Sequence, residues 1–157
     1  MSIAHEDRRP AARMVLRLDL PPRRASARQL RAALAGHLAA HGVPRAVSDQ
    51  VLLAADEAFV NAFMHGGDIG GAVEVRAQVL HDQVLVEIRD RGCGFDAGTV
   101  DVATMPDPLA THGRGLFLIH QLMDKVEVRS PAAGHGTLVR MGRRFSRRAS
   151  RIVGSTG

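Results

Sequence analysis

The sequence has a single cysteine, Cys93, no tryptophan and no tyrosine, and only 3% of its residues are aromatic. One cysteine excludes an internal disulfide and any metal site built from several cysteines. So few rings argue against a protein that stacks single-stranded bases. No run of about eighteen apolar residues occurs, and the first residues are of mixed charge, so we expect neither a membrane span nor a secretory signal. We therefore expect a soluble, cytoplasmic protein.

The formal net charge of +5 arises from one end of the chain. Residues 143–151 hold five arginines and no acidic residue, and the rest of the chain carries equal numbers of basic and acidic residues. We predict a flexible N-terminal segment (1–13), one folded domain (14–142) and a basic tail (143–157). Because the folded part is about neutral, we expect no direct binding of nucleic acid, although a tail that tethers the protein to an acidic surface remains a weaker alternative. The five arginines are Arg143, Arg144, Arg147, Arg148 and Arg151.

The 157 residues, 45% of them hydrophobic and 24% charged, fit one globular domain. Alternation of apolar and polar residues predicts short strands, and alanine- and leucine-rich stretches bounded by proline and glycine predict helices. The expected elements are a strand near 14–20, helices near 26–41 and 45–65, a hairpin of 73–80 with 84–90, a helix near 115–123, and strands near 125–130 and 137–142. This order predicts an α+β two-layer sandwich, with a mixed, mostly antiparallel sheet of about five strands and helices on one face.

The helix of residues 45–65 combines a core face with a polar stripe. Successive residues of a helix are rotated by 100° about its axis, so one narrow arc contains Gln50, Glu57 and Asn61. Glu57 and Asn61 are four residues apart, so their side chains are neighbours and can act on one bound object. For this pair alone, a solvated polar face is the simpler explanation. The predicted core face opposite the stripe consists of Leu52, Ala55, Phe59 and Phe63.

Two glycine-rich stretches give the polar stripe a context. In DRGCGFD, Asp90 ends a strand, and a carboxylate there can accept a hydrogen bond from an exocyclic amine. Gly92 and Gly94 follow and let the backbone approach a ligand or act as a hinge. In HGRGLFLI, Gly113 and Gly115 begin a helix, where free amides and the positive end of the dipole favour phosphate. Each stretch is common by itself, but their order along the chain is specific.

With these motifs the sequence resembles the GHKL ATPase superfamily, which includes gyrase, heat-shock chaperones, histidine kinases and MutL repair proteins. Its size and layout are similar to those of the anti-sigma-factor serine/threonine kinases. The resemblance covers residues 14–142 and depends on DEAFVNAFMHG, DRGCGFD, GRGLFLI and the final GHGTLVRM. It implies the Bergerat-type ATP-binding fold.

The resemblance also implies a role for each matching residue. Asn61 stands where the family has its magnesium-coordinating asparagine, and Glu57 matches the carboxylate that takes a proton from the attacking hydroxyl. Asp90 matches the residue that receives the adenine amino group, and Gly92 and Gly94 the start of the nucleotide lid. Thr137 would lie behind the adenine pocket, and His65 has no catalytic role. The segment whose backbone meets the phosphates is Gly113, Arg114, Gly115 and Leu116.

The activity implied is that of an ATP- and Mg²⁺-dependent kinase. Such a protein phosphorylates an anti-sigma-factor antagonist on serine or threonine and sequesters a sigma factor, usually as a homodimer. A sensor histidine kinase is disfavoured because His37 and His41 precede Leu38 and Gly42 rather than an acidic residue. The alternative function is a regulatory adaptor that sequesters a protein partner without kinase turnover. Cys93, within the DRGCGFD loop, more simply fills a turn than senses oxidation.

Overall fold

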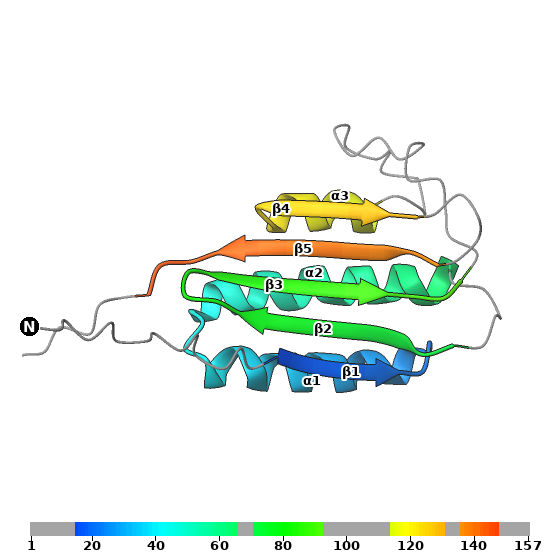
Figure 1. The fold of residues 1–157 in the computed structure, drawn as a ribbon, viewed down its shortest axis with the longest axis horizontal. Coiled ribbons are helices and arrows are strands. Elements are labelled where there is room, and N and C mark those ends of the chain that lie inside the picture. Colours follow the sequence, from blue (N-terminus) through cyan, green and yellow to red (C-terminus); the bar gives the residue numbers. More distant parts are fainter. Residues whose placement is uncertain (1–14, 66–70, 93–113, 131–135, 148–157) are drawn as a thin grey trace, which may run out of the picture.

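The computed structural model describes residues 15–65, 71–92, 114–130 and 136–147. They form five strands and three helices, with all three helices behind one face of the sheet (Figure 1). In chain order the elements are β1 (Val15–Leu20), α1 (Arg24–Ala40), α2 (Arg45–His65), β2 (Val73–Val79), β3 (Gln83–Arg89), α3 (Arg114–Leu122), β4 (Lys125–Arg129) and β5 (Leu138–Arg144). The predicted α+β two-layer sandwich is therefore confirmed.

The strand order in the sheet is β1-β2-β3-β5-β4, and every neighbouring pair is antiparallel. The sheet is thus wholly antiparallel among the described residues, whereas the sequence predicted a mixed one. The last strand of the chain lies between β3 and β4 because the β4–β5 hairpin attaches to the sheet through β5. This insertion brings the start of β5 beside the end of β3, at the right-hand side of the sheet in Figure 1.

Local sequence explains where the first two helices begin and end. Pro21 and Pro22 follow β1, and α1 begins two residues earlier than predicted. Its end is fixed by Gly42, which has φ +68° and donates its N–H to the carbonyl oxygen of Ala39 at 3.0 Å. Glycine adopts this left-handed conformation without strain, so it closes the helix. Pro44 then precedes α2, whose bounds match the prediction.

The buried surface of α2 is wider than one stripe, because the helix lies between α1 and α3 and also covers the sheet (Figure 1). Phe59 and Ala55 are buried as predicted, but Leu52 and Phe63 are only partly buried. Four of the six buried residues of this helix are alanines. The buried residues of α2 are Val51, Ala54, Ala55, Ala58, Phe59 and Ala62.

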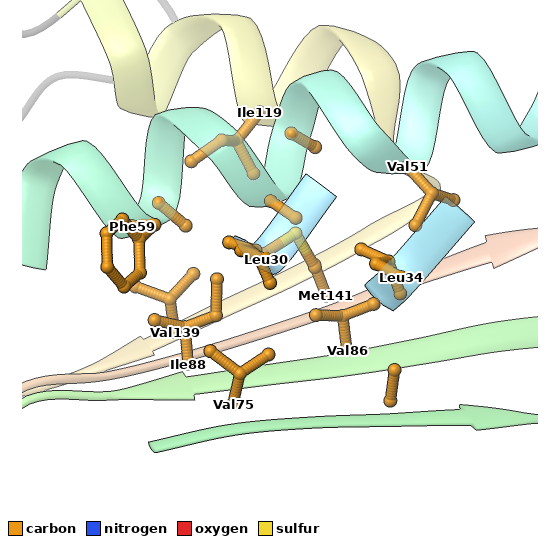
Figure 2. Close-up of a cluster of buried hydrophobic side chains, with 14 of the residues drawn as sticks. Leu30, Leu34, Val51, Phe59, Val75, Val86, Ile88, Ile119, Val139 and Met141 are labelled. Carbon is orange, nitrogen blue, oxygen red and sulfur yellow. The ribbon is translucent and has the colours of Figure 1, made fainter. Parts of the chain in front are cut away.

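The hydrophobic core lies between the helices and the inner face of the sheet. Figure 2 shows Phe59 and Val51 from α2 pointing toward the sheet, together with Leu30 and Leu34 from α1 and Ile119 from α3. The sheet contributes alternate residues of its central strands to this layer, as expected for strands with one buried face. Those labelled in Figure 2 are Val75, Val86, Ile88, Val139 and Met141.

The last strand extends two residues beyond its predicted end. Arg143 and Arg144 belong to β5, and Arg143 Nη1 donates to Asp124 Oδ1 at 2.7 Å. Phe145, the next residue, is buried in the core. The first two arginines of the predicted tail are therefore part of the sheet, which places the start of the tail later than residue 143.

Candidate functional site

Asp90 and Thr137 join the end of β3 to the start of β5. The Asp90 N–H donates to the Thr137 carbonyl oxygen at 3.0 Å, and the Thr137 N–H donates to Asp90 Oδ1 at 3.1 Å. The Gly92 N–H also donates to Asp90 Oδ1, at 2.9 Å. Both of these side-chain hydrogen bonds end on Oδ1 and none of those seen in the described residues ends on Oδ2. The backbone therefore fixes the carboxylate through Oδ1.

Glu57 and Asn61 lie side by side on α2 and face the first turn of α3. A Cβ atom built on Gly115 would lie 3.0 Å from Glu57 Oε2 and 3.0 Å from Asn61 Nδ2. A side chain at position 115 would crowd both groups, so glycine allows the start of α3 to lie close to them. The first turn of a helix has free backbone amides and the positive end of the dipole, which together favour an anionic group. The predicted acid and amide thus stand beside a predicted phosphate-binding helix end.

The proton affinity of Glu57 is shifted by its surroundings. Burial, and secondly the negative charge of the neighbouring Asp56, raises the pKa of Glu57 above its ordinary value. Asp56 itself is held by an ion pair with Arg31 of α1. A carboxylate with a raised pKa is a stronger base than an exposed one, which suits it to accept a proton from a hydroxyl group.

A small cavity connects the two parts of the site. Its volume is about 20 Å³, which holds one water molecule. Four predicted site residues line this cavity, although each of them comes from a different stretch of the sequence. The cavity is lined by Ala58, Asn61, Ala62, Ile88, Asp90, Leu116, Thr137 and Val139.

The remaining predicted site residues do not line this cavity among the described residues. Gly92 is buried beside Asp90, and Arg114 is exposed as the first residue of α3. Gly94 and Gly113 lie outside the described residues, as does Cys93, and the side chain of His65 is not described either.

The apolar walls of the cavity were not predicted from the sequence. Ala58 and Ala62 each follow a polar site residue by one position on α2, and this spacing with two small residues was an available signal. Ile88 and Val139 had no such signal, because alternating apolar residues occur in every strand of the sheet.

We expect Gly115→Ala to impair the site more than the fold. The added methyl group would stand 3.0 Å from the Glu57 and Asn61 side chains, tighter than ordinary contact, so these flexible groups must turn away. Any activity that needs both side chains in place should fall by about tenfold to a hundredfold, since small displacements of positioned groups are costly. Calorimetric unfolding should show a change in stability below about 1.5 kcal/mol, because alanine suits a helix. A large loss of stability with intact activity would contradict this placement.

The family model for the histidine kinase-like ATPase domain matches residues 20–143, which include both parts of this site. The chain belongs to this family. The resemblance to GHKL ATPases predicted from the motifs is therefore confirmed.

Curated relatives of this chain carry two kinds of name. The serine-protein kinase RsbW of Halalkalibacterium halodurans is 32% identical over 88 residues, which cover 52% of this chain and 54% of that protein. The anti-sigma F factor of Clostridium acetobutylicum is 30% identical over 106 residues, covering 62% of this chain and 71% of that protein. The chain thus spans about half the length of the first of these relatives.

A solved structure supports the fold independently. The RsbU and RsbW domains of a Mycobacterium tuberculosis protein match with a TM-score of 0.66 and 23% identity, covering 87% of this chain and 34% of that one. At this identity the match shows a shared architecture of sheet and helices. Within the described part of the chain, no helix is both long and apolar enough to cross a membrane.

Proposed function

We propose that this protein is an ATP-dependent serine/threonine protein kinase that acts as an anti-sigma factor. It would phosphorylate an anti-sigma-factor antagonist and sequester a sigma factor. The observation that carries this proposal is the meeting of two separate parts, the backbone-held carboxylate of Asp90 and the Glu57–Asn61 pair against the start of α3. The names of the curated relatives, serine-protein kinase RsbW and anti-sigma F factor, support the same activity and partners.

The residues fit ATP at both ends of the nucleotide. Asp90 can accept a hydrogen bond from the adenine amino group through Oδ2, while Oδ1 keeps its two backbone donors. At the other end, the absence of a side chain on Gly115 leaves space at the start of α3 for phosphate oxygens. The small cavity between them joins the two ends, because Asn61 and Leu116 line it together with Asp90 and Thr137.

The pair on α2 supplies the groups needed for phosphoryl transfer. Asn61 would hold Mg²⁺ through its amide oxygen, and one protein ligand is adequate because this ion retains waters and takes phosphate oxygens as ligands. When bound, Mg²⁺ neutralises charge on the phosphates during transfer. Among the described residues no cluster of three or more histidine, cysteine or acidic side chains offers another metal site. Glu57 would take the proton from the serine or threonine hydroxyl group. The oxygen of that hydroxyl group bonds to the γ-phosphorus of ATP, and ADP leaves.

Titration of Mg-ATP into the purified protein by calorimetry tests the nucleotide site without knowledge of the partner. We expect the wild type to bind and Asp90→Asn to bind about tenfold to a hundredfold more weakly. The asparagine oxygen can still accept the two backbone N–H groups, but its NH₂ group would face the adenine amino group, and hydrogen bonds to charged groups are worth about 1.5–3 kcal/mol. Asp82→Asn, an exposed carboxylate at the other end of β3, is the matched control and should bind as the wild type does.

A second candidate is a regulatory adaptor that sequesters a protein partner without turnover, and the name anti-sigma F factor of one relative supports it. Absence of Mg-ATP binding by the wild type would support the adaptor and contradict the kinase. Binding followed by transfer of phosphate to a serine or threonine of a co-expressed antagonist would support the kinase. Binding without transfer to any antagonist would point to an adaptor that responds to nucleotide.

A further inference from the structure

The C-terminal end of α1 carries two histidine side chains that the proposed function does not use. His37 and His41 are four residues apart, so their rings lie on one face of the helix. The ring centroids are 4.4 Å apart, and the ring planes are inclined by 48°. Two neighbouring imidazoles on one helix face are a recurrent arrangement for binding a metal ion.

Hydrogen bonding leaves Nε2 of each ring unpaired within the described part of the chain. His41 Nδ1 lies 2.7 Å from the carbonyl oxygen of His37. Because a carbonyl oxygen only accepts, Nδ1 carries the proton, and Nε2 of the neutral His41 ring has the lone pair. The same bond from a ring N–H to a carbonyl oxygen orients histidine ligands in metal sites. His37 Nε2 is buried without a partner, although buried polar atoms nearly always have one.

The backbone that carries both rings is held in place. The His41 N–H donates to the carbonyl oxygen of His37, and the Val43 N–H donates to that of Leu38 at 3.1 Å. Leu38 and Val43 are buried in the core, so they fix the end of the helix on each side of His41. Ligands on a fixed backbone lose less conformational freedom when an ion binds. The carbonyl end of a helix is also the negative end of its dipole, which favours a cation.

The end of the helix is open enough for water to reach the two rings. Both histidines are only partly buried, and the small residues Gly36 and Ala40 on the same helix are exposed. A Cβ atom built on Gly36 would meet nothing within 4 Å. No third histidine, cysteine or acidic side chain among the described residues completes a cluster with this pair, so water must fill the other coordination positions.

We propose that His37 and His41 bind one divalent transition-metal ion through their Nε2 atoms, with water at the remaining positions. A Zn²⁺ ion stands about 2.0–2.1 Å from each imidazole nitrogen, so the two nitrogens must come within about 4 Å of each other. Rings whose centroids are 4.4 Å apart reach this spacing by small rotations. Neutral imidazoles favour Zn²⁺, Cu²⁺ and Ni²⁺, whereas Mg²⁺ prefers oxygen ligands. The histidine pair therefore takes a different class of ion from the one assigned to Asn61.

This pair is remote from the proposed nucleotide site, and an ion bound there would stabilise α1. Arg45, the first residue of α2, follows soon after His41, and Glu57 is about 18 Å further along that helix at 1.5 Å per residue. An ion that joins two side chains one turn apart holds the end of α1 in its helical conformation. Because the unfolded chain does not keep the rings in this arrangement, the ion binds the folded state more tightly and stabilises it.

Calorimetric titration of Zn²⁺ into the full chain, without nucleotide or Mg²⁺, tests this site. We expect the wild type to bind an ion that His37→Ala and His41→Ala each bind at least about tenfold more weakly, since loss of even a group that only hydrogen-bonds to a ligand weakens a metal site by about 10- to 100-fold. At about a hundred times the dissociation constant, Zn²⁺ should raise the Tm of the wild type by about 5–10 °C. Each single variant should show a smaller rise at the same concentration.

Two matched variants show whether the pair, rather than any histidine, binds the ion. His81→Ala removes an exposed histidine outside α1 and should bind Zn²⁺ as the wild type does. The double variant Ala39→His with His41→Ala keeps the number of histidines but separates the rings by two positions, which places them on different sides of the helix. This variant should bind Zn²⁺ no better than His41→Ala does.

Circular dichroism should give native spectra for all of these variants, because alanine suits a helix and the replaced side chains are not in the core. A wild type that binds no Zn²⁺ would overturn the proposal. An affinity that survives either single substitution, or the change of spacing, would overturn it as well. The titration uses neither ATP nor a protein substrate, so its outcome is independent of the proposed function.

Discussion

Gly136→Ala should destabilise the protein severely, by about 2–6 kcal/mol. Gly136 has φ +83°, a conformation that costs a residue with a side chain about 1–3 kcal/mol. A Cβ atom at this position would also lie 2.0 Å from the Asp90 carbonyl oxygen and 3.0 Å from Arg91 Cα. Both of these atoms belong to the backbone and cannot rotate away, so the backbone at residue 136 must shift, at a further cost of about 1–3 kcal/mol.

The site should fail along with the fold in this variant. Gly136 precedes Thr137, whose N–H and carbonyl oxygen both bond to Asp90. A shift of residues 136 and 137 away from Asp90 lengthens these hydrogen bonds and releases the carboxylate that we assign to adenine. Any Gly136→Ala protein that folds should therefore bind Mg-ATP more weakly than the wild type.

Thermal unfolding followed by circular dichroism measures the effect, and the expected fall in Tm is of the order of 10 °C. Gly36→Ala is the matched control because it makes the same chemical change in the exposed middle of α1, where a Cβ would meet nothing within 4 Å. Alanine is the better helix former, so this control should gain about 0.5–1 kcal/mol. Equal melting temperatures for Gly136→Ala and the wild type would refute the close approach between Gly136 and Asp90.

Glu57→Gln should abolish most phosphoryl transfer while leaving nucleotide affinity nearly unchanged. Glutamine keeps the shape of the side chain but cannot take a proton, and general-base catalysis contributes about 10²- to 10⁴-fold to a rate. The change removes a partly buried charge, so the folded state should be no less stable at neutral pH. Single-turnover transfer of γ-phosphate to the antagonist, with calorimetry for binding, separates these two effects.

The pH dependence of the wild-type rate provides a second test of Glu57. The base works only when deprotonated, so the rate should fall as the pH drops through the pKa of this carboxyl. Burial and Asp56 raise that pKa, so the fall should occur at higher pH than for an ordinary glutamate, whose value is about 4.3. The residual rate of Glu57→Gln should lack this acidic limb.

Glu127→Gln serves as the control for the catalytic assignment. This acid lies on β4, opposite Arg140 and away from α2, and its replacement should change neither the rate nor its pH profile. A Glu57→Gln protein that transfers phosphate as fast as the wild type would exclude Glu57 as the base.

The elements of this fold follow closely from local sequence. The alternation of apolar and polar residues predicted the strands, and Gly42 and Pro44 marked the end of α1 and the start of α2. Most bounds therefore agree with the prediction within two residues. The end of β5 was missed because Arg143 and Arg144 are charged and continue into an arginine-rich stretch. Their place in the sheet depends on pairing with β3 and on Asp124, which is distant in sequence.

The side-by-side placement of Glu57 and Asn61 was also predictable, since residues four apart share a helix face by spacing alone. That spacing could not show what the face meets. Gly115 brings α3 against both side chains, and this contact joins residues more than fifty positions apart. The apolar wall formed by Ile88 and Val139 was likewise invisible, because its residues resemble all other core residues of the sheet.

The sequence by itself determined the secondary structure, the polar stripe on α2 and the positions of the glycines, because these depend on neighbours within a few residues. The tertiary structure alone decided that β5 enters the sheet between β3 and β4, and this insertion brings Thr137 to Asp90. It also decided that β1 and β4 form the two edges of the sheet. Such choices depend on burial and pairing summed over the whole sheet, which no short stretch of sequence contains.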